Sequence, residues 1–190
     1  MIKEAALDAF EIDADSATPV VGEVRDKLLE PFIAAVRTAL GEMAGTEVGV
    51  RGIYTKKPQA SPGLLPGAKE MVEPNDIAGV LEFSGANNGT LVLSFPHRTA
   101  QAMAGRILAD VMNDVDENLI RDCVGEIANV VAGQAKALLA GGEYQSSFSL
   151  PTVVVGAGAL RTHPGLDCHE IAFESDQGCF TLQLHLSPSR

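Results

Sequence analysis

The chain has 190 residues, of which 46% are hydrophobic and 21% charged, and it contains no tryptophan. This length and balance are typical of one globular domain that can bury a substantial core. The formal net charge of −11 argues against a nucleic-acid partner or an anionic membrane, because both repel an acidic surface.

Residues 1–21 are predicted to be an acidic N-terminal extension, and residues 22–190 a single domain. The extension is expected to be either a short helix over 2–10 or a loosely attached segment. It does not have the pattern of a signal peptide, and no apolar run approaches the roughly 18 residues of a membrane span. Three cysteines without CxxC spacing predict neither a disulfide framework nor a zinc site. A reducing cytoplasm is therefore the expected location.

After the extension, the spacing of apolar residues predicts alternating groups of helices and strands. Pro31 either starts the first helix or kinks it, because proline is tolerated only in the first turn. Prolines and glycines between residues 56 and 73 predict a loop. The predicted helices cover 32–43, 97–109 and 116–142, and the predicted strands cover 48–54, 77–83, 90–95, 147–155, 168–174 and 179–186.

Two hairpins are predicted, one at Asn88-Gly89 and one across 175–178. The strand 179–186 alternates apolar and polar residues, which predicts one buried and one solvated face. The order of elements does not alternate as in a doubly wound sheet. It predicts an α+β fold, with a largely antiparallel sheet and long helices on one of its faces.

A short internal repeat links the first and third predicted helices. Arg25-Asp26-x3-Glu30 matches Arg121-Asp122-x3-Glu126 at an offset of 96 residues. The first copy has Ile33 where the second has Asn129. The match is either chance or a sign of two pseudo-twofold halves, of which only the second keeps the polar pair.

The helix 116–142 separates into two opposed stripes at about 100° per residue. The polar stripe holds Asp122, Glu126 and Asn129, with Gly133 at its border. Glu126 and Asn129 are three residues apart, so their side chains point into the same volume. The opposite stripe is apolar and is expected to face the core: Ile120, Val124, Ile127, Val131, Ala135 and Leu138.

The ends of this helix and its glycines are also informative. Asp116 is the predicted N-cap, and the Gly141-Gly142 pair is predicted to stop the helix. Most polar stripes are solvated faces. Gly125 and Gly133 nevertheless border this one, although glycine inside a helix costs roughly 0.5–1 kcal/mol relative to alanine. The stripe is therefore either an idle surface or a face that another surface approaches closely.

Familiar catalytic motifs are missing from the rest of the sequence. It has no GxSxG elbow and no P-loop, and Gly156-Ala-Gly158 is too short for a dinucleotide fingerprint. The four histidines have no metal-ligand spacing among themselves, so we expect no metal site. The polar stripe remains the main candidate for chemistry.

The pattern Asp122-x3-Glu126-x2-Asn129 resembles the signature helix of the chemotaxis phosphatases of the CheC/CheX/FliY group. Their motif is Asp or Ser, three residues, Glu, two residues, Asn, and a proline some twenty residues on. Pro151 stands 22 positions after Asn129, one short of the usual spacing. A single complete motif makes the chain most similar to CheX. The resemblance covers roughly residues 23–186 and includes Pro31-Phe32-Ile33, 81–85, 89–94 and 149–152.

The resemblance implies a phosphatase that hydrolyses the aspartyl phosphate of a phosphorylated CheY-type receiver domain. Asn129 would position the attacking water, and Glu126 would dock against the receiver's active-site lysine. Asp122 would either contact the receiver or support the helix. Gly133 and Pro151 would belong to the partner-binding face.

The same resemblance implies that no cofactor is bound by this chain, because the receiver would supply Mg²⁺. It also implies a homodimer through paired sheet edges. The alternative is a non-catalytic adaptor of the same fold, which would bind a receiver domain or a component of the flagellar switch without hydrolysing the phosphate.

Overall fold

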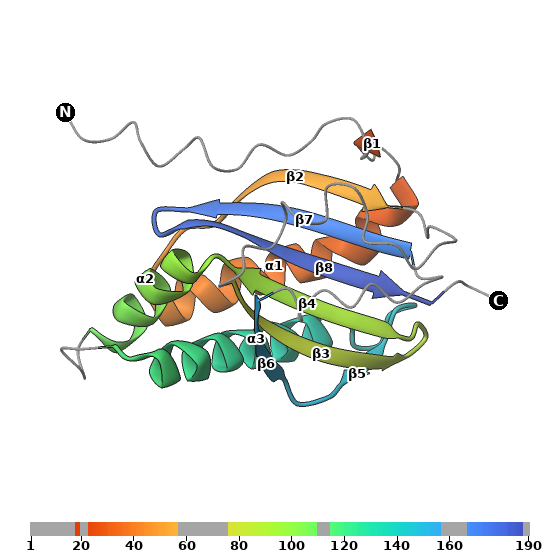
Figure 1. Ribbon diagram of the computed structural model, residues 1–190. Coiled ribbons are helices and arrows are strands. Elements are labelled where there is room, and N and C mark those ends of the chain that lie inside the picture. The colour runs from red at the N-terminus through yellow and green to blue at the C-terminus, as the bar shows by residue number, and fades with distance from the viewer. Residues whose placement is uncertain (1–17, 20–22, 57–75, 110–114, 157–166, 188–190) are drawn as a thin grey trace.

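The computed structural model describes residues 18–19, 23–56, 76–109, 115–156 and 167–187. These residues form an α+β fold in which three helices lie on one face of a curved sheet (Figure 1). The helices are α1 (Glu23–Ala44), α2 (His97–Leu108) and α3 (Glu117–Leu139). The strands are β1 (Thr18–Pro19), β2 (Gly49–Lys56), β3 (Ile77–Gly85), β4 (Gly89–Phe95), β5 (Ser146–Phe148), β6 (Thr152–Val155), β7 (Asp167–Ser175) and β8 (Gly178–Leu186).

The sheet has the strand order β1-β2-β7-β8-β4-β3-β5, and β6 pairs with β3 beyond β5 along the same edge. Every strand pair in the described part of the chain is antiparallel. This confirms the predicted fold class. The short β1 lies within the predicted N-terminal extension and pairs with β2.

The strand order has the symmetry expected of two related halves. In the first half, α1 is followed by β2 and then by the hairpin β3–β4. In the second half, α3 is followed by β5 and β6 and then by the hairpin β7–β8. The two hairpins meet at the centre, where β4 pairs with β8. β2 lies outside β7, and β5 and β6 lie outside β3. This arrangement supports the interpretation of the sequence repeat as two halves.

The predicted elements of the first half match the structure well, with one open alternative now decided. Helix α1 begins at Glu23, so Pro31 lies inside the helix instead of starting it. The predicted hairpin is confirmed, but Asn88-Gly89 is not a two-residue turn, because Gly89 already pairs with Phe83 as the first residue of β4. The Asn88 side chain accepts a hydrogen bond from the Gly85 N–H at 3.3 Å. The proposed helix over 2–10 and most of the loop over 56–73 lie outside the described residues.

The strand predicted over 147–155 is two strands with a break at 149–151. Both pair with β3, with Phe148 opposite Phe83 and Thr152 opposite Val80. Three residues of this edge therefore face two residues of β3, which is a bulge. An apolar run of this length carries no period that marks such an insertion, so the sequence alone did not predict it.

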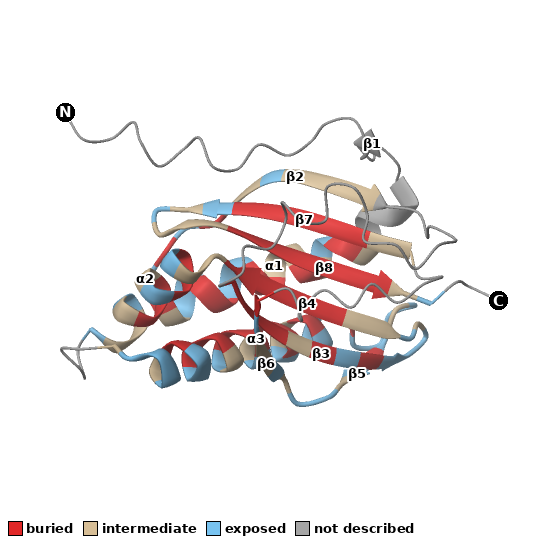
Figure 2. Cartoon of the chain, in the orientation of Figure 1, coloured by how far each residue is buried: buried red, intermediate tan, exposed pale blue. Residues whose placement is uncertain are grey.

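The core lies between the sheet and the paired helices α1 and α3. Phe32 and Val36 of α1 and Ile127 of α3 are fully or almost fully buried there. Phe95, Phe173 and Phe180 come from three neighbouring strands and stack on one another beneath the helices. Figure 2 shows that the exposed positions of α3 lie on the side of the helix away from the sheet.

The prediction of a solvated face on the last strand was wrong. Thr181, Gln183 and His185 of β8 are all buried, with at most 8% of their surface exposed. Because β8 lies between β7 and β4, these side chains find polar neighbours across the sheet; the Gln183 Nε2 donates to Glu170 Oε2 at 2.8 Å. Alternation identifies the polar face, but paired polar groups can be buried.

The β7–β8 turn fastens the sheet to the ends of two helices. Asp176 in this turn accepts hydrogen bonds from the Thr46 hydroxyl and from Arg106 of α2. The Arg106 guanidinium also donates to the carbonyl oxygens of Ala44 and Gly45 at the end of α1. A cation at this position stabilises the carbonyl groups that a helix leaves unpaired at its C-terminus.

None of the helices within the described ranges combines the length and the apolar composition that a membrane-spanning helix requires.

Candidate active site

The two ends of α3 are defined by local interactions that the sequence predicts. The Asp116 carboxylate accepts hydrogen bonds from the backbone N–H groups of Asn118 and Leu119, both at 2.9 Å. An N-cap of this kind stabilises a helix by about 1 kcal/mol. At the other end, Gly141 has φ of +72°, a backbone conformation that glycine adopts without strain. The position of the polar stripe along α3 is therefore set by interactions within the helix and at its ends.

The apolar stripe of α3 faces the core as predicted, with one exception. Ile120, Val124, Ile127, Val131 and Ala135 are buried. Leu138, however, is 53% exposed, and Leu139 is buried in its place. Leu138 lies in the last turn of the helix, where burial depends more on the position of neighbouring segments of the same chain than on helical phase.

The polar stripe is exposed over its whole length. Asp122, Glu126, Asn129 and Gly133 all face solvent. Three residues of a helix correspond to a rise of about 4.5 Å along its axis. The side chains of Glu126 and Asn129 therefore leave the helix about one turn apart on the same face. Among the described residues, the side chains of Asp122, Glu126 and Asn129 have no hydrogen-bond or ion-pair partner. Their polar groups are available to another molecule.

The two glycines beside the stripe have different explanations. A Cβ on Gly125 would lie 3.1 Å from the Val153 Cγ2, so Gly125 lets β6 approach the helix. A Cβ on Gly133 would have no atom within 4 Å. The closely approaching surface expected from the sequence is thus the protein's own strand at Gly125. Only Gly133 leaves an open patch of backbone on the polar stripe.

Helix α3 also packs closely against β3. A Cβ on Gly79 of β3 would lie 2.5 Å from the Cβ of Ala128. Gly79 pairs with Val153 of β6, which in turn contacts α3 near Gly125. The helix that carries the polar stripe is therefore packed against two strands. Such packing favours a preorganised binding surface.

Pro151 lies at the end of the bulge, directly before β6, and is half-buried. Proline suits this position because a bulge at a sheet edge does not need its backbone N–H. Pro151 is only two residues from Val153, the neighbour of Gly125. The structure thus brings Pro151 to the flank of α3, while the other four candidate residues share one face of that helix.

Two titratable residues, one on α3 and one in contact with it, have structural roles. Burial raises the pKa of the Cys123 thiol above its ordinary value of 9.0, and the charge of Asp122 raises it further. The thiol therefore stays protonated and faces the core, which does not suit a nucleophile. His97, at the start of α2, lies 2.7 Å from a Glu117 carboxylate oxygen and links the first turns of α2 and α3.

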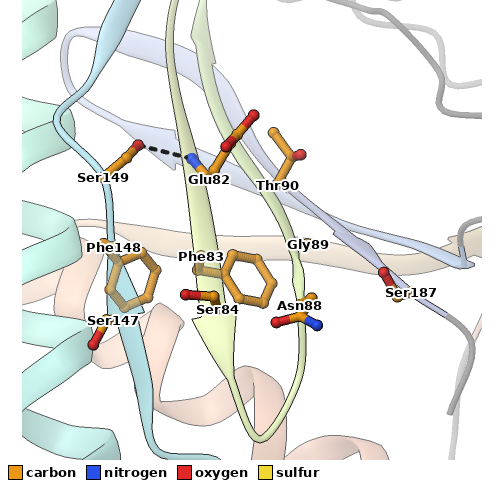
Figure 3. A pocket seen from close by; sticks show the side chains of 10 residues that line it. All are labelled: Glu82, Phe83, Ser84, Asn88, Gly89, Thr90, Ser147, Phe148, Ser149 and Ser187. Atoms are coloured by element: carbon orange, nitrogen blue, oxygen red, sulfur yellow. Dashed lines mark hydrogen bonds between the residues drawn. The ribbon is translucent and has the colours of Figure 1, made fainter. Parts of the chain in front are cut away.

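The candidate site is a convex helix face. An open hollow lies at the end of the β3–β4 hairpin and β5 (Figure 3), but none of the polar-stripe residues line it. It is lined by Glu82, Phe83, Ser84, Asn88, Gly89, Thr90, Ser147, Phe148, Ser149 and Ser187. Small substrates usually occupy enclosed pockets, whereas a convex polar face suits contact with another protein. The described residues include no cluster of three or more His, Cys, Asp or Glu side chains arranged to hold a metal ion.

The model of the family "Chemotaxis phosphatase CheX" matches residues 77–174, just over half of the chain. The chain belongs to this family. The matched segment extends from the start of β3 almost to the end of β7 and includes all of α3 and the bulge. No protein of curated function matches the sequence.

Solved structures agree with the family. A chemotaxis protein CheX from Desulfovibrio desulfuricans is 26% identical, with 85% of this chain and 99% of that chain covered and a TM-score of 0.69. CheX from Vibrio vulnificus is 23% identical over 85% of this chain and 99% of its own, with a TM-score of 0.66. A CheX–CheY–BeF3–Mg²⁺ complex from Borrelia burgdorferi matches at 18% identity, 84% and 97% coverage and a TM-score of 0.58. The last two similarities show a shared fold.

The sequence prediction missed two residues of this region, Ser149 and Leu150. Ser149-Leu150-Pro151-Thr152 is part of the family resemblance, but periodicity places all four in one strand. The structure shows Ser149 fixing the bulge through hydrogen bonds and Leu150 pointing into solvent. The only signal in the sequence was the proline, which favours an edge or a bulge.

Proposed function

We propose that this CheX-family protein is a phosphatase that accelerates hydrolysis of the aspartyl phosphate of a CheY-type receiver domain. The observation that carries the proposal is the exposed pair Glu126 and Asn129, which has no partner within the described chain and lies on a helix fixed at its cap and against two strands. The Borrelia burgdorferi relative, whose structure is a complex of CheX with CheY, BeF3 and Mg²⁺, supports a receiver as the partner.

Asn129 positions the attacking water beside the phosphoryl group. Phosphoryl transfer to water requires mainly positioning and stabilisation of charge, because the transition state is loose. A carboxamide can accept a hydrogen bond from the water and donate one to a phosphoryl oxygen. It also brings no negative charge toward a group that is already anionic. Mg²⁺ and the phosphoryl group both come from the receiver, and this chain supplies the amide.

Glu126 docks the receiver by pairing with its active-site lysine. The carboxylate lies one turn from the amide on the same face of α3, so an ion pair there fixes the approach of Asn129. Asp122 lies one turn further toward the N-terminus and adds a second negative charge to the face. Its role is either a contact with the receiver or support of the helix.

Gly133 and Pro151 complete the partner-binding face. Gly133 has free space above its backbone, so a receiver element can approach α3 closely one turn beyond Asn129. Pro151 defines the neighbouring rim formed by the bulge. The acidic net charge of −11 suits a partner that brings a lysine, and because receiver domains are cytoplasmic, the proposed place of action is the cytoplasm.

We also propose a homodimer formed through a sheet edge. In the described chain, β6 pairs with β3 on one side only, and Val155 at its end is 42% exposed. An open strand edge offers unpaired N–H and C=O groups to a second chain. Sedimentation equilibrium of the full chain tests this proposal, and a monomer at all accessible concentrations contradicts it.

The phosphatase proposal is tested by following the decay of a phosphorylated receiver from the same organism. The wild-type chain is expected to shorten the lifetime of the aspartyl phosphate, and Asn129→Ala to remove most of that effect while the fold survives. An adaptor would instead bind the receiver without changing the lifetime. That result would refute the phosphatase and leave only the binding role.

A further inference from the structure

Leu150 is the most exposed of the three large hydrophobic residues that are largely uncovered in the described chain. Its side chain is 83% exposed, compared with 53% for Leu138 and 42% for Val155. Single exposed apolar residues are common on protein surfaces. The backbone that presents Leu150, however, is unusually well held.

Hydrogen bonds of Ser149 hold the bulge that carries Leu150 against β3. The Ser149 N–H donates to the Glu82 carbonyl at 2.9 Å. The Glu82 N–H donates to the Ser149 hydroxyl at 3.0 Å, as the dashed line in Figure 3 shows. The same hydroxyl donates to the carbonyl of Leu150 at 3.0 Å. Pro151 restricts φ at the following position. Leu150 thus loses little backbone entropy when it is covered by a partner.

The strand register places this bulge beside the second half of α3. Gly79 of β3 packs against Ala128 near the middle of α3, and only residues 140–145 connect the end of α3 to β5. β3 therefore runs along α3 toward the C-terminus of that helix. The bulge faces residues 81 and 82 of β3 and so lies between these two points. This places it on the flank of α3, abreast of the turns that follow Asn129.

We propose that Leu150 is an apolar contact for the receiver domain that sets how tightly the receiver binds. The inference rests on the proposed function and deepens it. Charged groups such as Glu126 contribute mainly orientation and association rate, whereas a buried apolar anchor contributes affinity and slow dissociation. The partner is a receiver whose surface beside the phosphorylated aspartate has an apolar depression. Leu150 enters that depression while Asn129 reaches the phosphoryl group.

The test compares Leu150→Ser with the matched control Leu138→Ser. Leu138 is also an exposed leucine, but it lies about 150° around α3 from the polar stripe. Leu150→Ser is expected to raise both KM for the phosphorylated receiver and Kd for the receiver with BeF3 and Mg²⁺ by roughly tenfold, while kcat is unchanged. Leu138→Ser should change neither constant. Ser149→Ala, which releases the bulge but keeps Leu150, should give a smaller rise in Kd.

The outcomes separate this inference from the proposed function. Unchanged KM and Kd in Leu150→Ser, together with lost acceleration in Asn129→Ala, would overturn the role of Leu150 and leave the phosphatase intact. If the wild-type chain does not accelerate hydrolysis at all, the phosphatase fails, but Kd still tests Leu150 because binding needs no turnover. Conversion of a dimer to a monomer by Leu150→Ser would assign the residue to an interface between copies and overturn the inference.

Discussion

Replacing Asn129 by alanine removes one exposed carboxamide and leaves the rest of α3 in place. The side chain has no partner in the described chain, so its loss breaks no intramolecular hydrogen bond. Alanine has a higher helix propensity than asparagine, by up to about 0.7 kcal/mol. The free energy of unfolding is therefore expected to stay the same or rise slightly.

The expected effect on catalysis is much larger. Loss of one group that positions a reacting water or stabilises developing charge lowers kcat by about 10²–10³-fold in comparable sites. Pre-steady-state decay of a phosphorylated receiver, measured with excess phosphatase, gives this ratio directly. Circular dichroism and thermal unfolding show whether the fold is retained. Binding of the receiver should be affected less than hydrolysis, because Glu126 remains available.

Asn118→Ala is the matched control for this experiment. Asn118 is an exposed asparagine on the same helix, about 16 Å along the axis from Asn129. Its backbone N–H bonds to Asp116 and its side chain is not needed for that cap. Asn118→Ala should retain full acceleration. If Asn129→Ala is folded and keeps the wild-type rate, or if the control loses as much, the assignment of the water-positioning role is refuted.

Three further predictions concern packing, docking and pH. Gly79→Ala should lower the free energy of unfolding by about 1–3 kcal/mol in a denaturant titration, because the new Cβ would lie 2.5 Å from a side chain of α3; an unchanged midpoint would contradict the close packing. Gly133→Ala should raise stability by up to about 1 kcal/mol, since its Cβ meets no atom, yet weaken receiver binding; equal affinity would remove Gly133 from the docking face. A hydrogen bond from Thr46, with a smaller contribution from the Arg106 charge, lowers the pKa of Asp176 below its ordinary value of 3.8. The Asp176 carboxylate therefore stabilises the fold at pH values above 3.8, and this stabilisation is lost as pH falls through the folded-state pKa. The difference in Tm between wild type and Asp176→Asn should therefore shrink as pH falls below about 4, and a constant difference would contradict the prediction.

Local patterns predicted the parts of the molecule that depend on local interactions. The Asp116 cap, the stop at Gly141 and the opposed stripes of α3 follow from hydrogen bonds and side-chain directions within one helix. The hairpin turns are equally local. The antiparallel α+β fold followed from the order of these elements, and the family resemblance from the spacing of Glu126, Asn129 and Pro151.

Contacts between distant segments decided the rest. The exposure of Leu138 and the burial of Gln183 depend on which other segments of the chain lie next to them. Periodicity within a helix or strand does not encode these neighbours. Two glycines of α3 look alike in the sequence, yet Gly125 accommodates β6 while Gly133 is open.

The sequence by itself determined which face of α3 is polar, because helical phase is a property of the backbone. Only the tertiary structure decided that this face is exposed, that the helix is fixed against β3 and β6, and that Leu150 is exposed on a bulge between β5 and β6. These features arise from pairing of β3 with both β5 and β6, residues more than 60 positions apart in the chain. Such pairing depends on packing across the whole domain, which a one-dimensional pattern does not contain.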